Sequence, residues 1–236
     1  MKRWMMPLVA LLGAAIGGGA IWSYDRVAAP GGADRARIER VVHDYVLANP
    51  EIIPQAMQRL QERESGKLVA ANRAAITTPF GSAWAGNPKG DVTVVEYFDY
   101  NCGYCRASLP MIADLLARDR GIRLVYRDMP ILAETSRDAA RASLTAAQQG
   151  KFQAFHDALY AAGPVSPQTI AAASARAGVT GAADPATIDS EIARNLETAA
   201  KLGMTGTPSW VIGDRVLSGA LPVEELERAV AAARGK

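Results

Sequence analysis

The chain has two cysteines, Cys102 and Cys105, separated by Gly103 and Tyr104. They directly follow an apolar strand pattern and begin a helical one, which places them at a strand-to-helix junction. Positions three apart share a helix face, so the two sulfurs can form and break a disulfide in the first turn. The free N–H groups and the positive end of the helix dipole favour a thiolate on Cys102. The spacing therefore predicts a redox-active pair, with Cys102 the more exposed nucleophile and Cys105 the resolving thiol.

Glu96 is the second residue that could do chemistry, because it lies inside the apolar run Val92–Phe98, six positions before Cys102. Burial of a carboxyl group is costly and usually raises its pKa. An acid with a raised pKa can pass a proton to or from the resolving thiol during exchange. A glutamate that reaches solvent from an edge strand is the alternative, and the apolar character of the strand argues against it.

A third element, Gly206-Thr207-Pro208, directly precedes a predicted strand at 209–212. Proline is tolerated at a strand entry, where the ladder needs no backbone donor. Base rates favour a trans bond before any proline, and the pattern of residues alone does not fix the isomer.

Other interpretations of the cysteines are weaker. A zinc site would need two more ligands, and the chain offers only His43 and His156 as histidines. A static disulfide across so short a loop gains little chain entropy. The sequence therefore calls for no metal and no organic cofactor.

Both histidines are predicted to lie on a helix surface or in packing, although His156 could also face a substrate. Trp84 and Trp210 are predicted to be core or near-site residues.

The N-terminus carries an export pattern. Lys2 and Arg3 precede an uncharged run of 19 residues from Trp4 to Trp22. Residues 1–24 are predicted to be a signal peptide or a retained anchor in the inner membrane, with the body in the periplasm, where disulfides form. The net charge of +2 arises entirely within the first 33 residues, so the body shows no nucleic-acid surface by charge.

The rest of the chain divides into a linker, a helical region and an α/β body. Residues 25–33 are predicted to be the linker, and residues 34–75 the helical region. An apolar stripe there must dock on the body or on a second copy of the chain, and it consists of Ile38, Val42, Tyr45, Ile53, Met57 and Leu60. Glycines and prolines predict a looser stretch over 66–91. The body, residues 76–236, follows the order β-α-β, a helical insertion at about 136–202, then β-β-α.

The stretches VVEYFDYNCGYC, residues 94–105, and TGTPS, residues 205–209, resemble the thioredoxin superfamily. Within it they resemble the DsbA-like exported thiol–disulfide oxidoreductases. The resemblance implies a thioredoxin fold with an inserted helical subdomain, preceded by a short N-terminal helical segment. It also implies a cis Pro208 beside the cysteines, with Thr207 and Pro208 holding the substrate chain and Gly103 and Tyr104 on the substrate side. The Gly-Tyr pair between the cysteines is closer to DsbC-type isomerases than to the DsbA oxidase.

The segment VVHDYVLANPEIIPQAMQRLQ, residues 41–61, resembles the N-terminal helical region of ScsC-type proteins. That resemblance implies a homo-oligomer formed through residues 34–65. The expected partners are proteins with cysteines and a membrane redox partner. Four functions stay open at this point: an isomerase, a monomeric DsbA-like oxidase, a Cu(I)-binding protein that uses both thiolates, and a redox-inactive binding module.

Overall fold

The computed structural model describes residues 32–181 and 183–235. The chain divides into two compact units between Arg59 and Leu60. The first holds helix α2, Gly32–Ala48, and the start of helix α3, Ile52–Thr77. Between the helices the side-chain amide and the backbone N–H of Asn49 both donate hydrogen bonds to the Tyr45 carbonyl oxygen, over 2.9 Å and 3.0 Å, at the end of α2. Both front helices that the sequence predicts are thus present.

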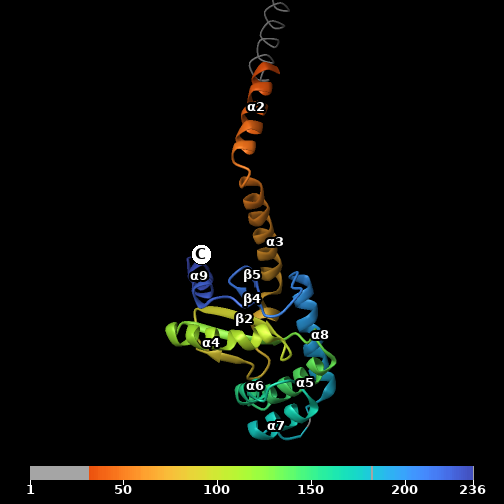
Figure 1. Ribbon diagram of the computed structural model, residues 1–236. Coiled ribbons are helices and arrows are strands. Elements are labelled where there is room, and N and C mark those ends of the chain that lie inside the picture. The colour runs from red at the N-terminus through yellow and green to blue at the C-terminus, as the bar shows by residue number, and fades with distance from the viewer. Residues whose placement is uncertain (1–31, 182, 236) are drawn as a thin grey trace, which may run out of the picture. The chain divides into compact units, whose positions relative to one another are not determined.

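The second unit is built on a mixed five-stranded sheet in the order β1-β3-β2-β4-β5 (Figure 1). The strands are β1 Trp84–Gly86, β2 Val92–Phe98, β3 Ile122–Asp128, β4 Ser209–Ile212 and β5 Arg215–Ser218. The two long strands, β2 and β3, run parallel, and helix α4, Gly103–Arg118, connects them. The remaining pairs are antiparallel. The predicted strands at 92–98 and 209–212 and the predicted order of strands and helices are confirmed.

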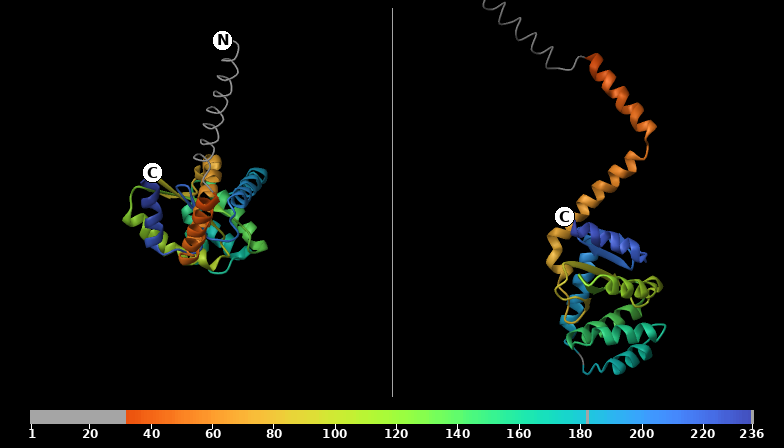
Figure 2. Two further views of the ribbon diagram at one scale, coloured as in Figure 1. Left: turned by 90° about the horizontal axis from the view of Figure 1, so that it is seen from above. Right: turned by 90° about the vertical axis from the view of Figure 1, so that its left-hand side faces the viewer.

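Helices cover the sheet on both faces, which explains why six of the seven residues of β2 are buried. Val94 and Phe98 belong to a core that includes residues of α4 and of helix α9, Val223–Arg234. Val95 and Tyr97 point to the opposite face and pack with residues of α3 and of helix α8, Pro185–Lys201. In Figure 2 (right) α4 and α9 lie on one side of the sheet. Glu96 shares the face of Val94 and Phe98, beneath the helix that begins after Cys102.

Four helices form the insertion between β3 and β4: α5 Glu134–Gln148, α6 Phe152–Ala161, α7 Pro167–Ala177 and α8 Pro185–Lys201. The breaks between these helices fall near Gly150, Gly163 and Gly178. Gly178 ends α7 in the left-handed conformation, with φ of +68°, which glycine adopts without a steric cost.

The predicted loose stretch over 66–91 is wrong in its first part, because α3 continues through Gly66 to Thr77. Glycine within a helix costs about 1 kcal/mol relative to alanine. Val69 and Ile76, which are completely buried, outweigh this cost, since each buried aliphatic side chain contributes roughly 1.5–3 kcal/mol. A Cβ atom at Gly66 would lie 3.4 Å from the Asp214 Cβ atom, which is an ordinary van der Waals contact with the β4–β5 turn. This end of α3 is part of the α/β unit, which begins at Leu60, upstream of the predicted boundary at residue 76.

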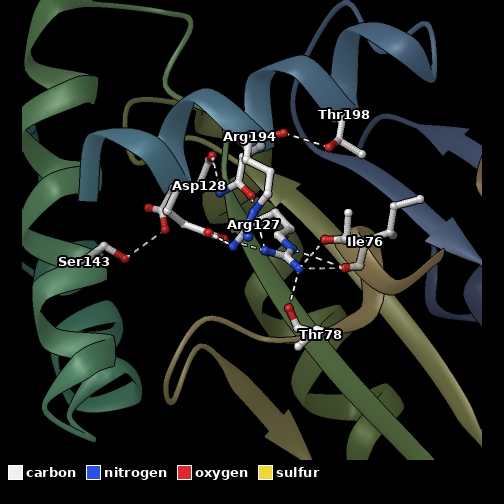
Figure 3. Close-up of polar contacts among 10 residues, drawn as sticks. Ile76, Thr78, Arg127, Asp128, Ser143, Arg194 and Thr198 are labelled. Atoms are coloured by element: carbon white, nitrogen blue, oxygen red, sulfur yellow. Dashed lines mark hydrogen bonds and ion pairs between the residues drawn. The ribbon is translucent and has the colours of Figure 1, made fainter. Parts of the chain in front are cut away.

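A buried arginine on β3 fixes the C-terminal end of α3 (Figure 3). Arg127 donates hydrogen bonds to the carbonyl oxygens of Ala75 over 2.6 Å, Ile76 over 3.1 Å, and Thr78. The Ala75 and Ile76 carbonyls belong to the last turn of α3, whose carbonyls have no partner within the helix, and Thr78 directly follows the helix. Arg127 also forms a 2.6 Å ion pair with Glu191 of α8, and both side chains are at most 2% exposed. The arginine thereby joins α3, β3 and α8 on one face of the sheet.

The export segment at 1–24 and most of the linker at 25–33 lie outside the described residues. The last residues of that linker differ from the prediction, since α2 already begins at Gly32. Within residues 32–181 and 183–235, no helix is both long enough and apolar enough to cross a membrane.

Candidate active site at the start of helix α4

Cys102 is the N-cap of α4, and its sulfur accepts a hydrogen bond from the backbone N–H of Cys105 at 3.4 Å. Both cysteines are free thiols. Cys102 is the less buried of the two, with 6% of its surface exposed against 1% for Cys105. A Cβ atom added to Gly103 would have no neighbouring atom within 4 Å, and Tyr104 is 70% exposed. The first turn of α4 is therefore open to a partner chain, while the second thiol lies beneath it.

The turn before β4 lies directly against Cys102. The Cys102 thiol donates a hydrogen bond to the carbonyl oxygen of Thr207 over 3.1 Å. The peptide bond between Thr207 and Pro208 is cis, as the resemblance implies. Cys102 and Thr207 thus lie side by side because β4 pairs with β2, the strand that leads to the cysteines.

Glu96 occupies the centre of the sheet, opposite Tyr126 on β3 and Trp210 on β4. It is 2% exposed. Burial, and secondarily the charge of Cys102, raises its pKa from 4.5 to about 8. Burial also raises the pKa of Cys105, and the Glu96 charge raises it further. The carboxyl group is therefore electrostatically coupled to both thiols and titrates near neutral pH, where proton transfer is most effective.

A groove of about 500 Å³ opens beside Cys102. Its walls come from the start of α4 and from the loop between α6 and α7, and the lining residues are Tyr100, Asn101, Cys102, Gly103, Arg106, Gly163, Pro164 and Val165. Arg106 donates a hydrogen bond to the Gly163 carbonyl oxygen over 2.8 Å and another to the Tyr160 carbonyl oxygen. Sequence reasoning missed Arg106, although a charged residue directly after the second cysteine is a visible signal. It ties the helical insertion to the active-site helix.

The two histidines have separate places. His156 is 1% exposed, and its Nδ1 atom lies 3.1 Å from the Tyr100 hydroxyl, among five aromatic rings. Burial lowers its pKa to about 3, so the ring is neutral and acts in packing, as predicted. His43 lies at the surface of α2, with 68% of its side chain exposed. Among the described residues, no group of three or more His, Cys, Asp or Glu side chains could hold a metal ion.

Of the two tryptophans, Trp210 is completely buried, and its indole donates a hydrogen bond to the Gly219 carbonyl oxygen over 2.9 Å. Trp84 is partly buried on the edge strand β1. A polar chain behind the site was also missed by sequence reasoning: the Tyr100 hydroxyl donates to Ser143, which donates to the buried Asp128, each over 3.2 Å. Figure 3 shows the contact between Ser143 and Asp128. Nothing in the spacing of these residues marks them as neighbours, because three separate elements contribute them.

The fold and the cysteine pair together define the class of thioredoxin-fold thiol–disulfide oxidoreductases. The chain belongs to the DSBA-like thioredoxin domain family, whose model matches residues 93–231. A second family model, described as the copper resistance protein ScsC N-terminal domain, matches residues 34–65.

Several solved structures are similar. A thioredoxin-like oxidoreductase from Silicibacter pomeroyi DSS-3 is 39% identical and covers 70% of this chain and 99% of its own, with a TM-score of 0.63. A periplasmic thioredoxin-like protein from Salmonella enterica serovar Typhimurium is 29% identical and covers 70% of this chain and 96% of its own, with a TM-score of 0.64. A linker-deletion variant of Proteus mirabilis ScsC is 25% identical and covers 88% of this chain and 98% of its own, with a TM-score of 0.70.

A curated relative is much longer. The Na(+)/H(+) antiporter NhaA 1 of Salinispora arenicola is 30% identical over 165 residues, which is 63% of this chain and 24% of the antiporter. The chain therefore spans about a quarter of the length of this relative.

Proposed function

We propose that this protein exchanges disulfides with cysteine-containing client proteins in the periplasm. The observation that carries the proposal is the placement of the free Cys102 thiol, which lies at the N-cap of α4 and against the Thr207 carbonyl oxygen. An N-terminal helix position stabilises the thiolate that the reaction needs. The export pattern of residues 1–24 supports a periplasmic location, with that segment either cleaved or kept as an inner-membrane anchor.

The exchange proceeds in two displacements. The Cys102 thiolate attacks one sulfur of a client disulfide, forms a Cys102–client disulfide and releases the other client sulfur as a thiolate. Cys105 then loses its proton and attacks the Cys102 sulfur. The Cys102–Cys105 disulfide forms and the second client thiolate leaves. Two electrons pass from the cysteine pair to the client, and the same steps in reverse oxidise a client dithiol.

Glu96 handles the proton of Cys105 in this scheme. The buried thiol has a raised pKa and holds its proton at neutral pH, so it needs a base when it attacks. Glu96 titrates near pH 8 in the same buried region and can take the proton in one direction and return it in the other. No metal or organic cofactor enters any step.

The client chain is held by backbone contacts at the turn of Thr207 and Pro208. When Cys102 is a thiolate or part of a disulfide, it no longer donates to the Thr207 carbonyl oxygen. That oxygen can then accept a hydrogen bond from a client N–H. The open space over Gly103 and the exposed ring of Tyr104 leave room for the client on the other side.

Isomerase activity through a homo-oligomer is the form of the function that we favour. The stripe predicted from the sequence is exposed along its whole length, from 50% at Leu60 to 67% at Met57. Exposed apolar area of this kind marks an interaction surface. A second copy would cover it and would place several cysteine pairs around one client. The alternative is a monomeric oxidase that a membrane redox partner reoxidises.

Two measurements test the proposed function. Reduction of insulin disulfides by the reduced protein, without added metal, is expected, and its absence would contradict the proposal and favour a thiolate-based Cu(I) site. The reduction potential against glutathione sets the direction. A strongly oxidising value indicates an oxidase, whereas an intermediate value with refolding of a scrambled substrate indicates an isomerase.

A further inference from the structure

Asp99 is a buried acidic residue to which the exchange scheme gives no role. It directly follows β2, three positions before Cys102, and 2% of its surface is exposed. A buried carboxyl group is costly unless hydrogen bonds or opposite charges compensate for the lost solvent. Hydrogen bonds supply the compensation here, and they connect Asp99 to both cysteines.

The Asp99 carboxylate binds backbone N–H groups on two segments of the chain. Its Oδ1 atom accepts a hydrogen bond from the N–H of Asn101 over 2.9 Å. Its Oδ2 atom accepts from the N–H groups of Ile131 over 2.9 Å and Leu132 over 3.0 Å, in the loop between β3 and α5. Both oxygens act as acceptors, as they do in an ionised carboxylate. The side chain thus fixes the backbone directly before Cys102 to a neighbouring loop.

The backbone of Asp99 contacts the cysteine pair itself. Its carbonyl oxygen accepts hydrogen bonds from the Cys102 N–H over 2.9 Å and from the Tyr160 hydroxyl over 3.3 Å. Burial raises the pKa of Cys105, the Glu96 charge raises it further, and a hydrogen bond from the Asp99 N–H acts in the opposite direction. One residue therefore holds the backbone at the first cysteine and donates to the sulfur of the second.

The contact with Cys105 matters because that sulfur carries negative charge when it reacts. Cys105 is 1% exposed, so solvent contributes little to stabilising its thiolate. A backbone N–H that already points at the sulfur stabilises the charge without having to reorganise. The orientation of this N–H depends on the backbone of residues 99–101, which the Asp99 carboxylate holds in place.

We propose that Asp99 is a positioning residue for the resolving step, and that its carboxylate orients its own backbone N–H toward the Cys105 sulfur. This inference rests on the proposed function and adds a residue to the same site. The bond between Cys105 and Cys102 forms, the bond between Cys102 and the client breaks, and the client sulfur leaves with the electron pair. The Cys105 proton passes to Glu96, and the Asp99 N–H keeps its own proton throughout.

Two substitutions change the carboxylate without removing the backbone N–H. Asp99→Ala removes all three contacts that hold the segment. Asp99→Asn keeps one acceptor oxygen but places an NH2 donor group against backbone N–H groups, so it retains only part of them. We therefore expect Asp99→Asn to lie between Asp99→Ala and the wild type.

The reagent dithiobis(nitrobenzoate), a symmetric aromatic disulfide with a coloured thiolate product, separates the two displacements. In excess reagent, attack by Cys102 on the reagent releases the first coloured thiolate, and attack by Cys105 on the resulting mixed disulfide releases the second. Stopped-flow absorbance measures both phases. Asp99→Ala should slow the second phase about tenfold, the usual effect of losing one hydrogen bond to a charged group. The first phase should change by less than about twofold.

The matched control is Ser136→Ala, which loosens the same segment and loop but leaves Asp99 intact. Ser136 accepts hydrogen bonds from the Asn101 side-chain amide over 2.9 Å and from the Ala133 N–H over 3.2 Å. In this variant both phases should stay within about twofold of the wild type. If Asp99→Ala does not fold, Asp99→Asn provides the same comparison with a smaller effect.

Three results would overturn the inference: an unchanged second phase in both Asp99 variants, equal slowing of the two phases, or the same slowing of the second phase in Ser136→Ala. The last two would show that Asp99 is merely structural. Failure of the proposed function itself gives a different result. A wild-type protein that keeps the aromatic group bound, with no Cys102–Cys105 disulfide by mass spectrometry, would contradict that function rather than the role of Asp99.

Discussion

The Cys102 thiol donates a hydrogen bond to the carbonyl oxygen of Thr207, over 3.1 Å and across 105 positions of sequence. This contact joins the start of α4 to the turn that precedes β4. It depends on the thiol proton, so it is present only in the reduced, protonated state. In the proposed exchange, the loss of that proton makes Cys102 a nucleophile and, in the same event, frees the Thr207 carbonyl oxygen to accept a hydrogen bond from the client.

Alkylation of the reduced protein at mildly acidic pH should modify Cys102 first. Cys102 is the less buried thiol, and burial together with the Glu96 charge raises the pKa of Cys105. Peptide mapping by mass spectrometry measures the order. In addition, Cys105→Ser should accumulate a client–Cys102 disulfide, whereas Cys102→Ser should accumulate none. Preferential labelling of Cys105 would reverse the assigned roles.

The substitution Glu96→Gln should slow the resolution of the mixed disulfide by about a hundredfold near neutral pH, the usual contribution of a positioned acid–base group. The amide keeps the size of the side chain but cannot take the Cys105 proton. Rapid acid quenching followed by separation of the mixed disulfide measures this step. Glu134→Gln, at an exposed position in the first turn of α5, is the control. Equal resolution rates in Glu96→Gln and the wild type would remove Glu96 from the mechanism.

The same substitution should stabilise the reduced protein in a pH-dependent way. The pKa of Glu96 is about 8 in the folded state, against 4.5 for an ordinary glutamate. Between these values the unfolded chain loses a proton that the folded chain keeps, so the stability of the wild type falls as pH rises through this window. Below pH 4.5 both states are protonated and the effect is absent. In urea unfolding, the free energy of unfolding of Glu96→Gln should therefore rise relative to that of the wild type between pH 5 and 8, by on the order of a few kcal/mol. A difference that does not vary with pH would contradict the raised pKa.

The local signals were sufficient for much of the fold. The apolar run of β2 and the helical pattern that begins at the cysteines are local signals, and they predict the observed strand and helix. The length of α3 was not predictable, because Gly66 weakens the local helix signal. The helix is held by Val69, Ile76 and a donor from Arg127, about 50 residues further along the chain. For the site, the cysteines, Glu96 and Pro208 stand out by type and position. Tyr100, Ser143 and Asp128 do not, since only tertiary structure brings them together.

The substitution Arg127→Met should lower the free energy of unfolding by about 3 kcal/mol or more, since it leaves Glu191 buried with one partner fewer. It also removes the donor from the last carbonyls of α3. The matched control is Arg141→Met, because Arg141 pairs with Asp189 of α8 while both side chains are over 40% exposed, and such a pair contributes less than about 1 kcal/mol. Urea unfolding of both variants tests this. Equal destabilisation in the two variants would show that the buried Arg127–Glu191 pair contributes no more to the free energy of unfolding than the exposed pair does.

Charge placed in the front stripe should dissociate the protein into monomers. Substitution is preferable to deletion of residues 34–65, because the compact α/β unit already begins at Leu60. Val42→Glu with Met57→Glu introduces carboxylates at positions that are 55% and 67% exposed, where the isolated chain tolerates them and a contact with a second copy does not. Light scattering of the protein without residues 1–24 should show an oligomer for the wild type and a monomer for the variant. The control Arg40→Glu changes charge on the same helix outside the stripe. The variant should still reduce insulin but fail to refold a scrambled substrate. A wild-type protein that is monomeric at micromolar concentration would contradict self-association and favour the monomeric oxidase.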